Sequence, residues 1–379
     1  MKTVVRLGCA LAAATATTAV FAGPASAATP SDRGANATHA VFVQTDETAG
    51  NHVVAYREAP NGTLTLSGTY ATGGNGGVLA TSVIDHLASQ GAVTYDQRHG
   101  LLYVVNAGSD SVSVFAVHGD DLSLRQVVGS RGSFPVSVAV HGDVVYVLNA
   151  LGGASIQGYY VIGDRLFPLP HSNRELGLDP TEVTFTKTPG QVSFSPDGAH
   201  LLITTKANGN NIDVFGVDRF GFVSAHPAVT NVPGGVPFAI SYDPRGHVEV
   251  AMAGTASVTS YQLNYNASLT QLAATVPTGQ AGTCWVVSDG RLLFTTNPGS
   301  ASVTSLTASS TGTVTVDGST PTDAGTVDPA VSADGRYLYV ETGAAGIVDE
   351  YAVHTDGGLT KIGSATVANA TGAEGIATS

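Results

Sequence analysis

The sequence predicts an all-β protein, a seven-bladed β-propeller that is closed when its C-terminal strand pairs into the N-terminal blade. Three observations lead to this prediction. Alternating apolar and β-branched residues, broken by Gly, Asn-Gly and Asp-Gly, run through the chain without a sustained helical period. A three-strand pattern recurs at the spacing of a propeller blade. Complementary parts of one further blade lie at the two ends of the chain.

The N-terminus has the features of a secretory signal peptide. Lys2 and Arg6 precede an apolar stretch of small residues, and Ala25-Ser26-Ala27 supplies a cleavage pattern. The apolar stretch is too short and too rich in Ala and Thr to favour a membrane span. We therefore expect a signal peptide that ends at Ala27, a secreted protein, a flexible segment over residues 28–38 and a single propeller domain over residues 39–379.

One segment serves as the template for a blade. It contains Gly91–Asp96, Leu101–Asn106 and Ser111–Val117, three predicted strands separated by turns. The same unit returns at Val136–Val161, Gln191–Val217, Phe238–Leu263, Cys284–Leu306 and Pro329–Val353. Equivalent second-strand residues lie 43 to 57 residues apart, close to the roughly 40–50 residues of a four-stranded blade. The longest interval contains an insertion around Gly163–Pro189.

The seventh unit is split between the two ends of the chain. Ala40–Gln44 and His52–Arg57 match a second and a third strand, but no first strand precedes them. Gly372–Ala377 resembles the start of a first strand, as in Ser89–Val93. We expect this C-terminal tail to supply the innermost strand of the N-terminal blade, which would leave no open sheet edge in the ring.

Composition excludes several classes of partner and chemistry. The formal net charge of −13 becomes about −15 without Lys2 and Arg6, which argues against nucleic acid, anionic membranes and membrane insertion. The mature chain has one cysteine, Cys284, and so no intrachain disulfide. Its His residues are scattered, and the usual nucleophile motifs are absent. We expect no metal and no cofactor, and a monomer.

The second strands resemble those of a known family. Tyr103-Val-Val-Asn106, Tyr146-Val-Leu-Asn149 and Phe294-Thr-Thr-Asn297 look like its Tyr-Val-Thr-Asn repeat, and Phe194-Ser-Pro-Asp-Gly198 also fits. The chain resembles the lactonase-family propellers, which include bacterial 6-phosphogluconolactonase and the fungal carboxymuconate lactonizing enzyme. At Ser89-Gln-Gly91 and Cys284-Trp285, among other positions, it is most similar to exported actinobacterial lactonase-like proteins.

The resemblance does not extend to the family's catalytic residues. Enzymes of this family use a His, an Arg pair and a Glu at the mouth of the channel. The matching positions here are Val136, Gly190-Gln191 and Lys206-Ala207. The family's lactone chemistry therefore cannot be transferred residue by residue. No cluster of Lys and Arg and no Gly-rich helix start is present to hold a phosphate, so a phosphorylated sugar lactone is disfavoured.

Propeller geometry nevertheless places polar residues together. The starts of the first strands converge on one face of the channel, and the ends of the second strands lie at the same face. We expect catalytic roles for Lys206, Glu374 and Glu341. We expect ligand binding by Gln90, Asn106, Asn149, Gln191, Trp285 and Asn297. The alternatives are that the Asn residues end strand ladders, that Trp285 fills the core, and that Cys284 is a buried inert thiol rather than a nucleophile.

Two functions from different classes remain open. The first is a secreted lactonase-like hydrolase or isomerase that acts on a non-phosphorylated lactone or cyclic carboxylic acid. The second is a non-catalytic extracellular propeller that binds a glycan or a protein. The binding protein would present its rim and loops to its partner. We expect a small-molecule or glycan ligand in the central channel. A metal- or quinone-dependent dehydrogenase is disfavoured because no cluster of acidic ligands is visible.

Overall fold

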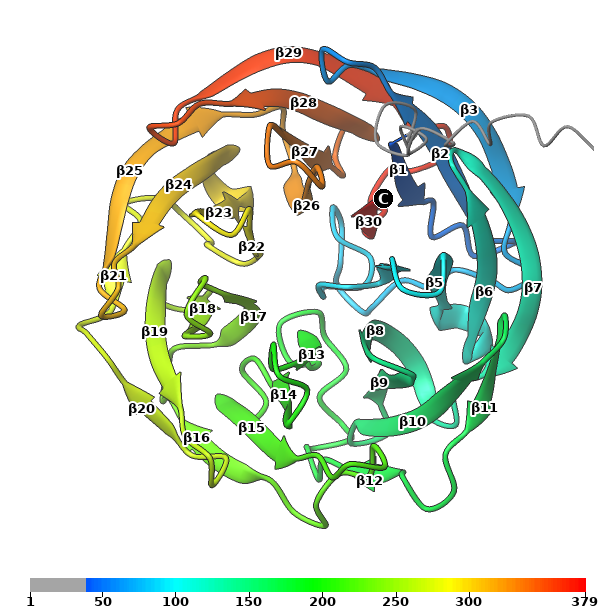
Figure 1. The fold of residues 1–379 in the computed structure, drawn as a ribbon, viewed down its shortest axis with the longest axis vertical. Coiled ribbons are helices and arrows are strands. Elements are labelled where there is room, and N and C mark those ends of the chain that lie inside the picture. Colours follow the sequence, from blue (N-terminus) through cyan, green and yellow to red (C-terminus); the bar gives the residue numbers. More distant parts are fainter. Residues whose placement is uncertain (1–38) are drawn as a thin grey trace, which may run out of the picture. The chain divides into compact units, whose positions relative to one another are not determined.

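The computed structural model describes residues 39–379, so the predicted signal peptide and the segment 28–38 lie outside the described residues. Seven sheets follow one another around a central axis (Figure 1). The predicted seven-bladed propeller is confirmed. No helix within residues 39–379 has the length and apolarity needed to cross a membrane.

The strands of each blade are arranged in order from the channel outward. Blade 1 contains β30 (Ile376–Thr378), β1 (Ala40–Gln44), β2 (His52–Glu58) and β3 (Leu64–Ala71). Blade 2 contains β4 (Val93–Asp96), β5 (Leu101–Asn106), β6 (Ser111–His118) and β7 (Asp121–Gly129). Blade 3 contains β8 (Ser133–His141), β9 (Val144–Leu151), β10 (Ser155–Ile162) and β11 (Arg165–Pro168), and β12 (Arg174–Glu175) also pairs with β10.

Blade 4 contains β13 (Gln191–Phe194), β14 (His200–Thr204), β15 (Asn211–Gly216) and β16 (Ala228–Asn231). Blade 5 contains β17 (Pro237–Tyr242), β18 (Val248–Met252), β19 (Ser257–Leu263) and β20 (Leu269–Gln271), with β21 (Val276–Pro277) paired to β19. Blade 6 contains β22 (Val286–Ser288), β23 (Leu292–Asn297), β24 (Ser302–Ala308) and β25 (Val314–Pro321). Blade 7 contains β26 (Thr326–Val331), β27 (Tyr337–Thr342), β28 (Ile347–Val353) and β29 (Leu359–Thr366). Two 3-10 turns, η1 (Ala107–Ser109) and η2 (Pro298–Ser300), follow β5 and β23.

The C-terminal strand closes the ring as predicted. Strand β30 pairs antiparallel with β1, and Phe42 lies opposite Ala377. The strand begins a few residues later than the sequence indicated, because the chain turns at Gly375, where φ is +126°. There the Gly375 carbonyl accepts a hydrogen bond from the Gln44 backbone N–H, at 3.0 Å. A left-handed φ of this kind favours glycine at the position.

The aromatic residues of the second strands hold neighbouring blades together. Tyr146 and Tyr339 are fully buried between blades. The hydroxyl of Tyr146 donates to the Gly221 carbonyl of blade 4 at 2.9 Å, and that of Tyr339 donates to the Gly62 carbonyl of blade 1 at 3.0 Å. A buried tyrosine needs such a partner for its hydroxyl. The repeated aromatic position thus stabilises the contacts between blades.

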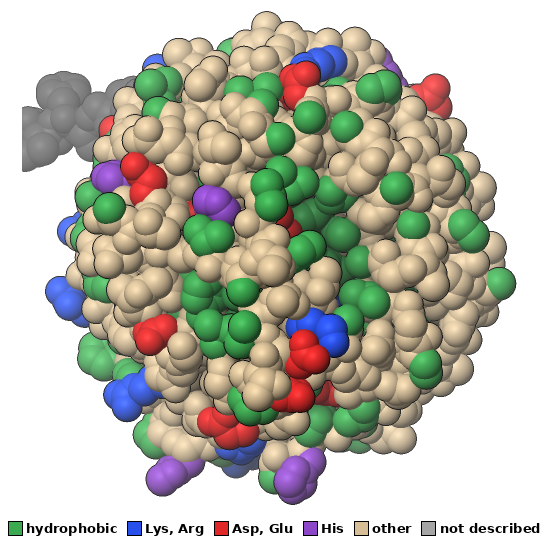
Figure 2. All heavy atoms as spheres, turned by 180° about the vertical axis from the view of Figure 1, so that it is seen from behind, with side chains coloured by type: hydrophobic (Ala, Val, Ile, Leu, Met, Phe, Trp, Pro, Cys, Tyr) green, Lys and Arg blue, Asp and Glu red, His purple; other side chains and the backbone are tan. Residues whose placement is uncertain are grey.

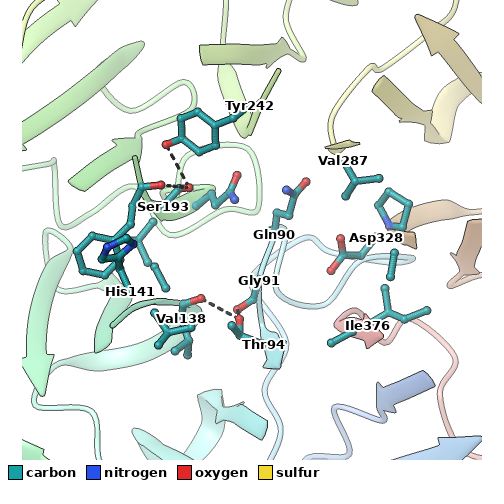
Figure 3. Close-up of a pocket in the computed structure, with 18 of the residues that line it drawn as sticks. Gln90, Gly91, Thr94, Val138, His141, Ser193, Tyr242, Val287, Asp328 and Ile376 are labelled. Atoms are coloured by element: carbon teal, nitrogen blue, oxygen red, sulfur yellow. Dashed lines mark hydrogen bonds between the residues drawn. The ribbon is translucent and has the colours of Figure 1, made fainter. Parts of the chain in front are cut away.

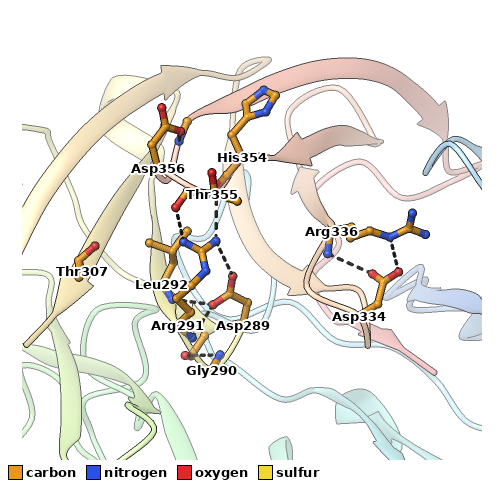
Figure 4. A network of polar contacts seen from close by, with 12 residues as sticks. Asp289, Gly290, Arg291, Leu292, Thr307, Asp334, Arg336, His354, Thr355 and Asp356 are labelled. Carbon is orange, nitrogen blue, oxygen red and sulfur yellow. Dashed lines mark hydrogen bonds and ion pairs between the residues drawn. The ribbon is translucent and has the colours of Figure 1, made fainter. Parts of the chain in front are cut away.

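Charged residues join blades 6 and 7 near the tight turns between their first and second strands (Figure 4). Arg291 donates hydrogen bonds to the backbone carbonyls of Thr355 and His354, and its guanidinium lies 3.5 Å from the Asp289 carboxylate. Arg336 pairs with Asp334 in the next turn. Arg291 and Arg336 are largely exposed, so we expect their ion pairs to add little stability.

Candidate functional site

The side chain of Gln90, which precedes β4, reaches across the central channel from blade 2 to blade 6. Its amide nitrogen donates to the Val286 carbonyl and its amide oxygen accepts from the Val286 N–H, both at 3.0 Å. The amide oxygen of Gln191 likewise accepts from the Ile240 N–H. Both glutamines were predicted to bind ligand. In the structure their side-chain amides form hydrogen bonds to the backbone of neighbouring inner strands.

A cavity of about 220 Å³ lies on one side of Gln90, toward the face where the first strands begin. We call it the lid cavity. Its apolar walls include Ile84, Phe185, Val236, Phe238, Ala253 and Trp285. Its polar groups are Asp85, Lys206 and Cys284, with Thr186 at the edge.

Two inter-blade segments, residues 72–92 and 177–190, supply part of this cavity, and we call them the lid loops. The second is the end of the insertion that the sequence placed at Gly163–Pro189. The loops contact each other through a parallel bridge between Ala80 and Thr184, where the Phe185 N–H donates to the Ala80 carbonyl at 3.2 Å. The Gln90 N–H also donates to the Gly190 carbonyl, at 3.0 Å.

Lys206 forms hydrogen bonds to both lid loops and so joins them. Its ammonium donates to the carbonyls of Ala88, at 2.6 Å, and Phe185, at 2.5 Å, and to the hydroxyl of Thr188, at 3.2 Å. The side chain is 1% exposed, and the ammonium lies 5.1 Å from the centre of the Phe238 ring. Burial lowers the pKa of Lys206 to about 8, although the nearby acidic groups oppose this shift.

Asp85 is one of the residues that line the lid cavity, and Glu374 lies next to it. The Asp85 carboxylate accepts a hydrogen bond from the Ala88 N–H at 2.7 Å, and its side chain is hydrogen-bonded to that of Glu374. Glu374 accepts bonds from the Ser89 N–H and hydroxyl. Burial raises the pKa of Asp85, and burial together with the Asp85 charge raises the pKa of Glu374 well above its usual range. The two carboxyl groups therefore titrate as one coupled pair.

Cys284 and Trp285 occupy the blade 6 wall of the lid cavity. Burial raises the pKa of the Cys284 thiol to about 12, so at neutral pH the group is a neutral thiol and a poor nucleophile. The indole nitrogen of Trp285 donates to the Ser89 carbonyl at 2.5 Å, and its ring packs on Phe238 with 4.7 Å between centroids. Trp285 therefore contributes a rigid apolar wall.

Glu341, predicted as catalytic, lies outside the lid cavity. Its carboxylate accepts a hydrogen bond from the Gly375 N–H at 2.8 Å, and Asp46 similarly accepts from the Glu374 N–H at 3.0 Å. Burial raises the pKa of both carboxyls well above the usual range. These two groups hold the turn that leads into β30, so their contacts in the structure are with the ring closure.

The three asparagines predicted to bind ligand are fully buried at the ends of their strands: Asn106, Asn149 and Asn297. The amide nitrogen of Asn106 donates to the Ser113 hydroxyl at 2.8 Å, and that of Asn297 donates to the Thr304 hydroxyl at 3.0 Å. None of the three lines the lid cavity. Their contacts are those of residues that end a strand ladder.

On the other side of Gln90 the channel opens into a space of about 510 Å³, which we call the funnel (Figure 3). Its walls are the ends of the innermost strands and carry Thr94, Ser193, Tyr242 and Asp328. In the close-up view Asp328 points toward Gln90. Within residues 39–379, no group of three or more His, Cys, Asp or Glu side chains is placed to hold a metal ion.

Comparison with solved structures identifies the type of propeller. A Lactobacillus plantarum protein matches with a TM-score of 0.71 and 18% identity over 90% of this chain and 98% of its own. The periplasmic gluconolactonase PpgL from Pseudomonas aeruginosa matches with a TM-score of 0.68 and 16% identity over 87% and 96%. A proposed 6-phosphogluconolactonase from Bacteroides uniformis matches with a TM-score of 0.68 and 16% identity over 91% and 100%. The chain shares the fold of these three proteins.

No protein-family model and no curated protein sequence matches the chain. At the identities above, the structural likeness establishes the fold alone and leaves the reaction to be argued from the site. Asp85 is the functional candidate that sequence reasoning missed. It lies in an inter-blade loop with no repeat or motif around it, and only the fold brings it beside Lys206.

Proposed function

We propose that the protein is an exported lactonase that hydrolyses a non-phosphorylated lactone in the lid cavity. The observation that supports this most directly is that Asp85 and Lys206 both line one apolar cavity in a lactonase-type propeller. A phosphorylated substrate fits poorly, because Lys206 is the only Lys or Arg lining the cavity and its ammonium already has three protein acceptors. Phosphate recognition needs free cationic donors.

Asp85 is the proposed general base. Its pKa, raised by burial, brings it closer to neutral pH, where a carboxylate can accept a proton efficiently. Asp85 takes a proton from a water molecule as the water oxygen attacks the lactone carbonyl carbon. The ring C–O bond then breaks, and Asp85 returns the proton to the leaving ring oxygen, which gives a hydroxy acid.

Lys206 and Glu374 are the proposed positioning residues. The Lys206 charge favours ionised Asp85 and the negative charge that develops on the carbonyl oxygen, and both effects are enhanced in an apolar site. It acts through its charge, because its three hydrogen bonds go to the lid loops. Glu374, held by Ser89, orients Asp85 and keeps its proton.

The Asp85→Asn variant tests this proposal. We expect kcat/KM for lactone opening to fall by roughly 10²–10⁴, the usual contribution of a general base, as measured by acid release in a pH-stat assay with a panel of lactones. Asp317→Asn, at an exposed carboxyl on β25, is the matched control and should leave kcat/KM unchanged. Full activity of Asp85→Asn would refute the proposed role.

Export is part of the proposal and rests on the signal-peptide pattern and on the periplasmic location in the name of PpgL. The mature protein recovered from the culture medium should begin at Ala28, as measured by N-terminal sequencing.

The open funnel favours a second function, a non-catalytic propeller that binds a glycan. Tyr242 and Ser193 line the funnel and could contact a sugar. Calorimetric titration with cell-wall glycans tests this function. Heat that is lost in Tyr242→Ala, together with no turnover of any lactone, would favour the binding protein over the enzyme.

A further inference from the structure

The walls of the lid cavity favour apolar ligands over ligands that carry hydroxyl groups. Phe185, Val236, Phe238 and Trp285 provide apolar surface. The donors among the polar groups are already engaged: the Lys206 ammonium by three acceptors and the Trp285 indole N–H by the Ser89 carbonyl. Asp85 is the acceptor that the proposed catalytic water uses. A hydroxyl group buried against the remaining apolar walls would lose its water without gaining a partner, which weakens binding.

The volume of the cavity limits what can be enclosed. A volume of about 220 Å³ lies below the roughly 300–1,000 Å³ of typical ligand pockets, so it suits a six-membered lactone ring without large substituents. A longer substituent on the ring would have to extend out of the cavity past the lid loops. A sugar lactone, which carries hydroxyl groups around the ring, is too polar for the apolar walls of this space.

The lid loops present an apolar surface next to the cavity. Ile84 and Phe185 line the cavity, and Val83, the neighbour of Ile84, is 79% exposed. Val78 and Val183 on the same loops are also exposed, at 43% and 38%. The bridge between Ala80 and Thr184 keeps these segments side by side. Figure 2 shows hydrophobic side chains gathered around a hollow near the middle of one face of the propeller.

We infer that the substrate is a lactone with an aliphatic side chain, whose ring lies in the lid cavity and whose chain lies over the exposed valines of the lid loops. This inference rests on the proposed function. It separates the protein from the gluconolactonase named among its structural neighbours, because the same fold would here select for apolar substituents and against hydroxyl groups.

Binding can be measured separately from turnover, because Trp285 is the only tryptophan in the sequence and lines the cavity. The experiment titrates the Asp85→Asn variant and follows Trp285 fluorescence. The ligands share one ring size: δ-valerolactone, δ-octalactone, δ-decalactone and freshly dissolved glucono-δ-lactone. We expect the Kd to fall with chain length, by up to about fourfold for each added methylene that leaves water. We expect glucono-δ-lactone to bind at least about 10-fold more weakly than δ-octalactone.

Two variants locate the ring and the chain. Ala253→Leu should fill the cavity and weaken binding of every δ-lactone by about 10-fold or more, through overpacking. Val83→Asp changes an exposed residue, so the fold should be kept. It should raise the Kd of δ-decalactone by about three- to tenfold and leave the Kd of δ-valerolactone unchanged. Val229→Asp, at an exposed valine on β16, is the matched control.

The outcomes separate this inference from the proposed function. If glucono-δ-lactone binds and is hydrolysed as well as δ-octalactone, the inference is wrong and the lactonase proposal stands. If the alkyl lactones bind as expected but the wild-type protein does not open them, the ligand class is supported and the catalytic proposal fails. If no lactone changes Trp285 fluorescence and none is hydrolysed, both are wrong.

Discussion

The two halves of the central channel differ in chemistry. The lid cavity is small and apolar, and it brings Asp85 together with Lys206. The funnel is larger and open, and hydroxyl groups of Thr94, Ser193 and Tyr242 line it. The connections explain the difference. Tight turns such as Pro196-Asp-Gly198 lie at the funnel face, whereas the lid loops are long enough to reach the axis at the other face.

Loop length, more than the sequence of the inner strands, therefore decides which half of the channel becomes a site. A rigid scaffold that carries functional loops is a common arrangement in proteins. The difference between the halves depends on three side chains: Lys206, which holds the lid loops, Gln90, which reaches across the channel, and Asp328, which lines the funnel. Each can be altered.

Lys206→Met should have the largest effect. It removes a buried ammonium and leaves three acceptors without their donor, so the free energy of unfolding should fall by about 2–5 kcal/mol. Urea denaturation measures this change, and hydrogen exchange in residues 177–190 should become faster. Lys187→Met is the matched control, because Lys187 forms an exposed ion pair with Glu182 in the same region and should cost about 1 kcal/mol or less. Equal effects of the two variants would show that Lys206 does not hold the lid loops.

Gln90→Ala should have the next largest effect. It leaves the N–H and carbonyl of Val286 without partners in the channel, which should lower the free energy of unfolding by about 1–3 kcal/mol. Acrylamide should also quench Trp285 fluorescence more strongly, because the two halves would be joined.

Gln126→Ala provides the control for Gln90→Ala. The Gln126 amide contacts the backbone of Leu166 in the same way, but near the outer edge of blades 2 and 3. Water can replace the amide there, so the loss should be smaller. Unchanged quenching of Trp285 in Gln90→Ala would argue that Gln90 is not the barrier between the two halves.

The sequence was sufficient to predict the propeller because its repeat is a property of every blade. The second-strand tyrosines recur since each one fills the same gap between blades, and the split blade follows from counting units. The contacts of the side chains near the axis were harder to predict from the sequence. Lys206 and Trp285 share a cavity, as expected from strands that converge on one face, but the asparagines at equivalent strand ends point into their own blades.

The carboxyl groups show why the rest could not be predicted. Asp85 lies in a loop whose path depends on the neighbouring insertion, and nothing local distinguishes it from a solvated residue. The positions of Glu374 and Glu341 in the repeat predict that they lie near the channel, but their hydrogen bonds to Ser89 and Gly375 depend on how the C-terminal tail turns. Long-range contacts of this kind leave no periodic signal in a sequence.

Asp328→Asn should have the smallest effect, and that effect should depend on pH. Burial raises the pKa of Asp328 well above its usual range, so the folded protein keeps a proton that the unfolded chain releases near pH 4. The stability from this group is complete below that pH and is lost as the pH rises toward the folded pKa. An asparagine carries no such proton, so the fall in unfolding free energy between pH 5 and pH 8 should be smaller in the variant, by about 1 kcal/mol or more.

The same variant should keep lactone turnover at its optimum pH, because Asp328 lines the funnel and Asp85 lines the lid cavity. The pH dependence of turnover should move to lower pH, because the Asp328 charge interacts with Asp85 and raises the pKa of Glu374. Urea denaturation at several pH values and the pH-stat assay measure the two properties in one variant. If Asp328→Asn abolished turnover as Asp85→Asn is expected to do, the two halves of the channel would act as one site. The division by Gln90 would then have no functional meaning, and the ligand would have to contact both carboxyl groups.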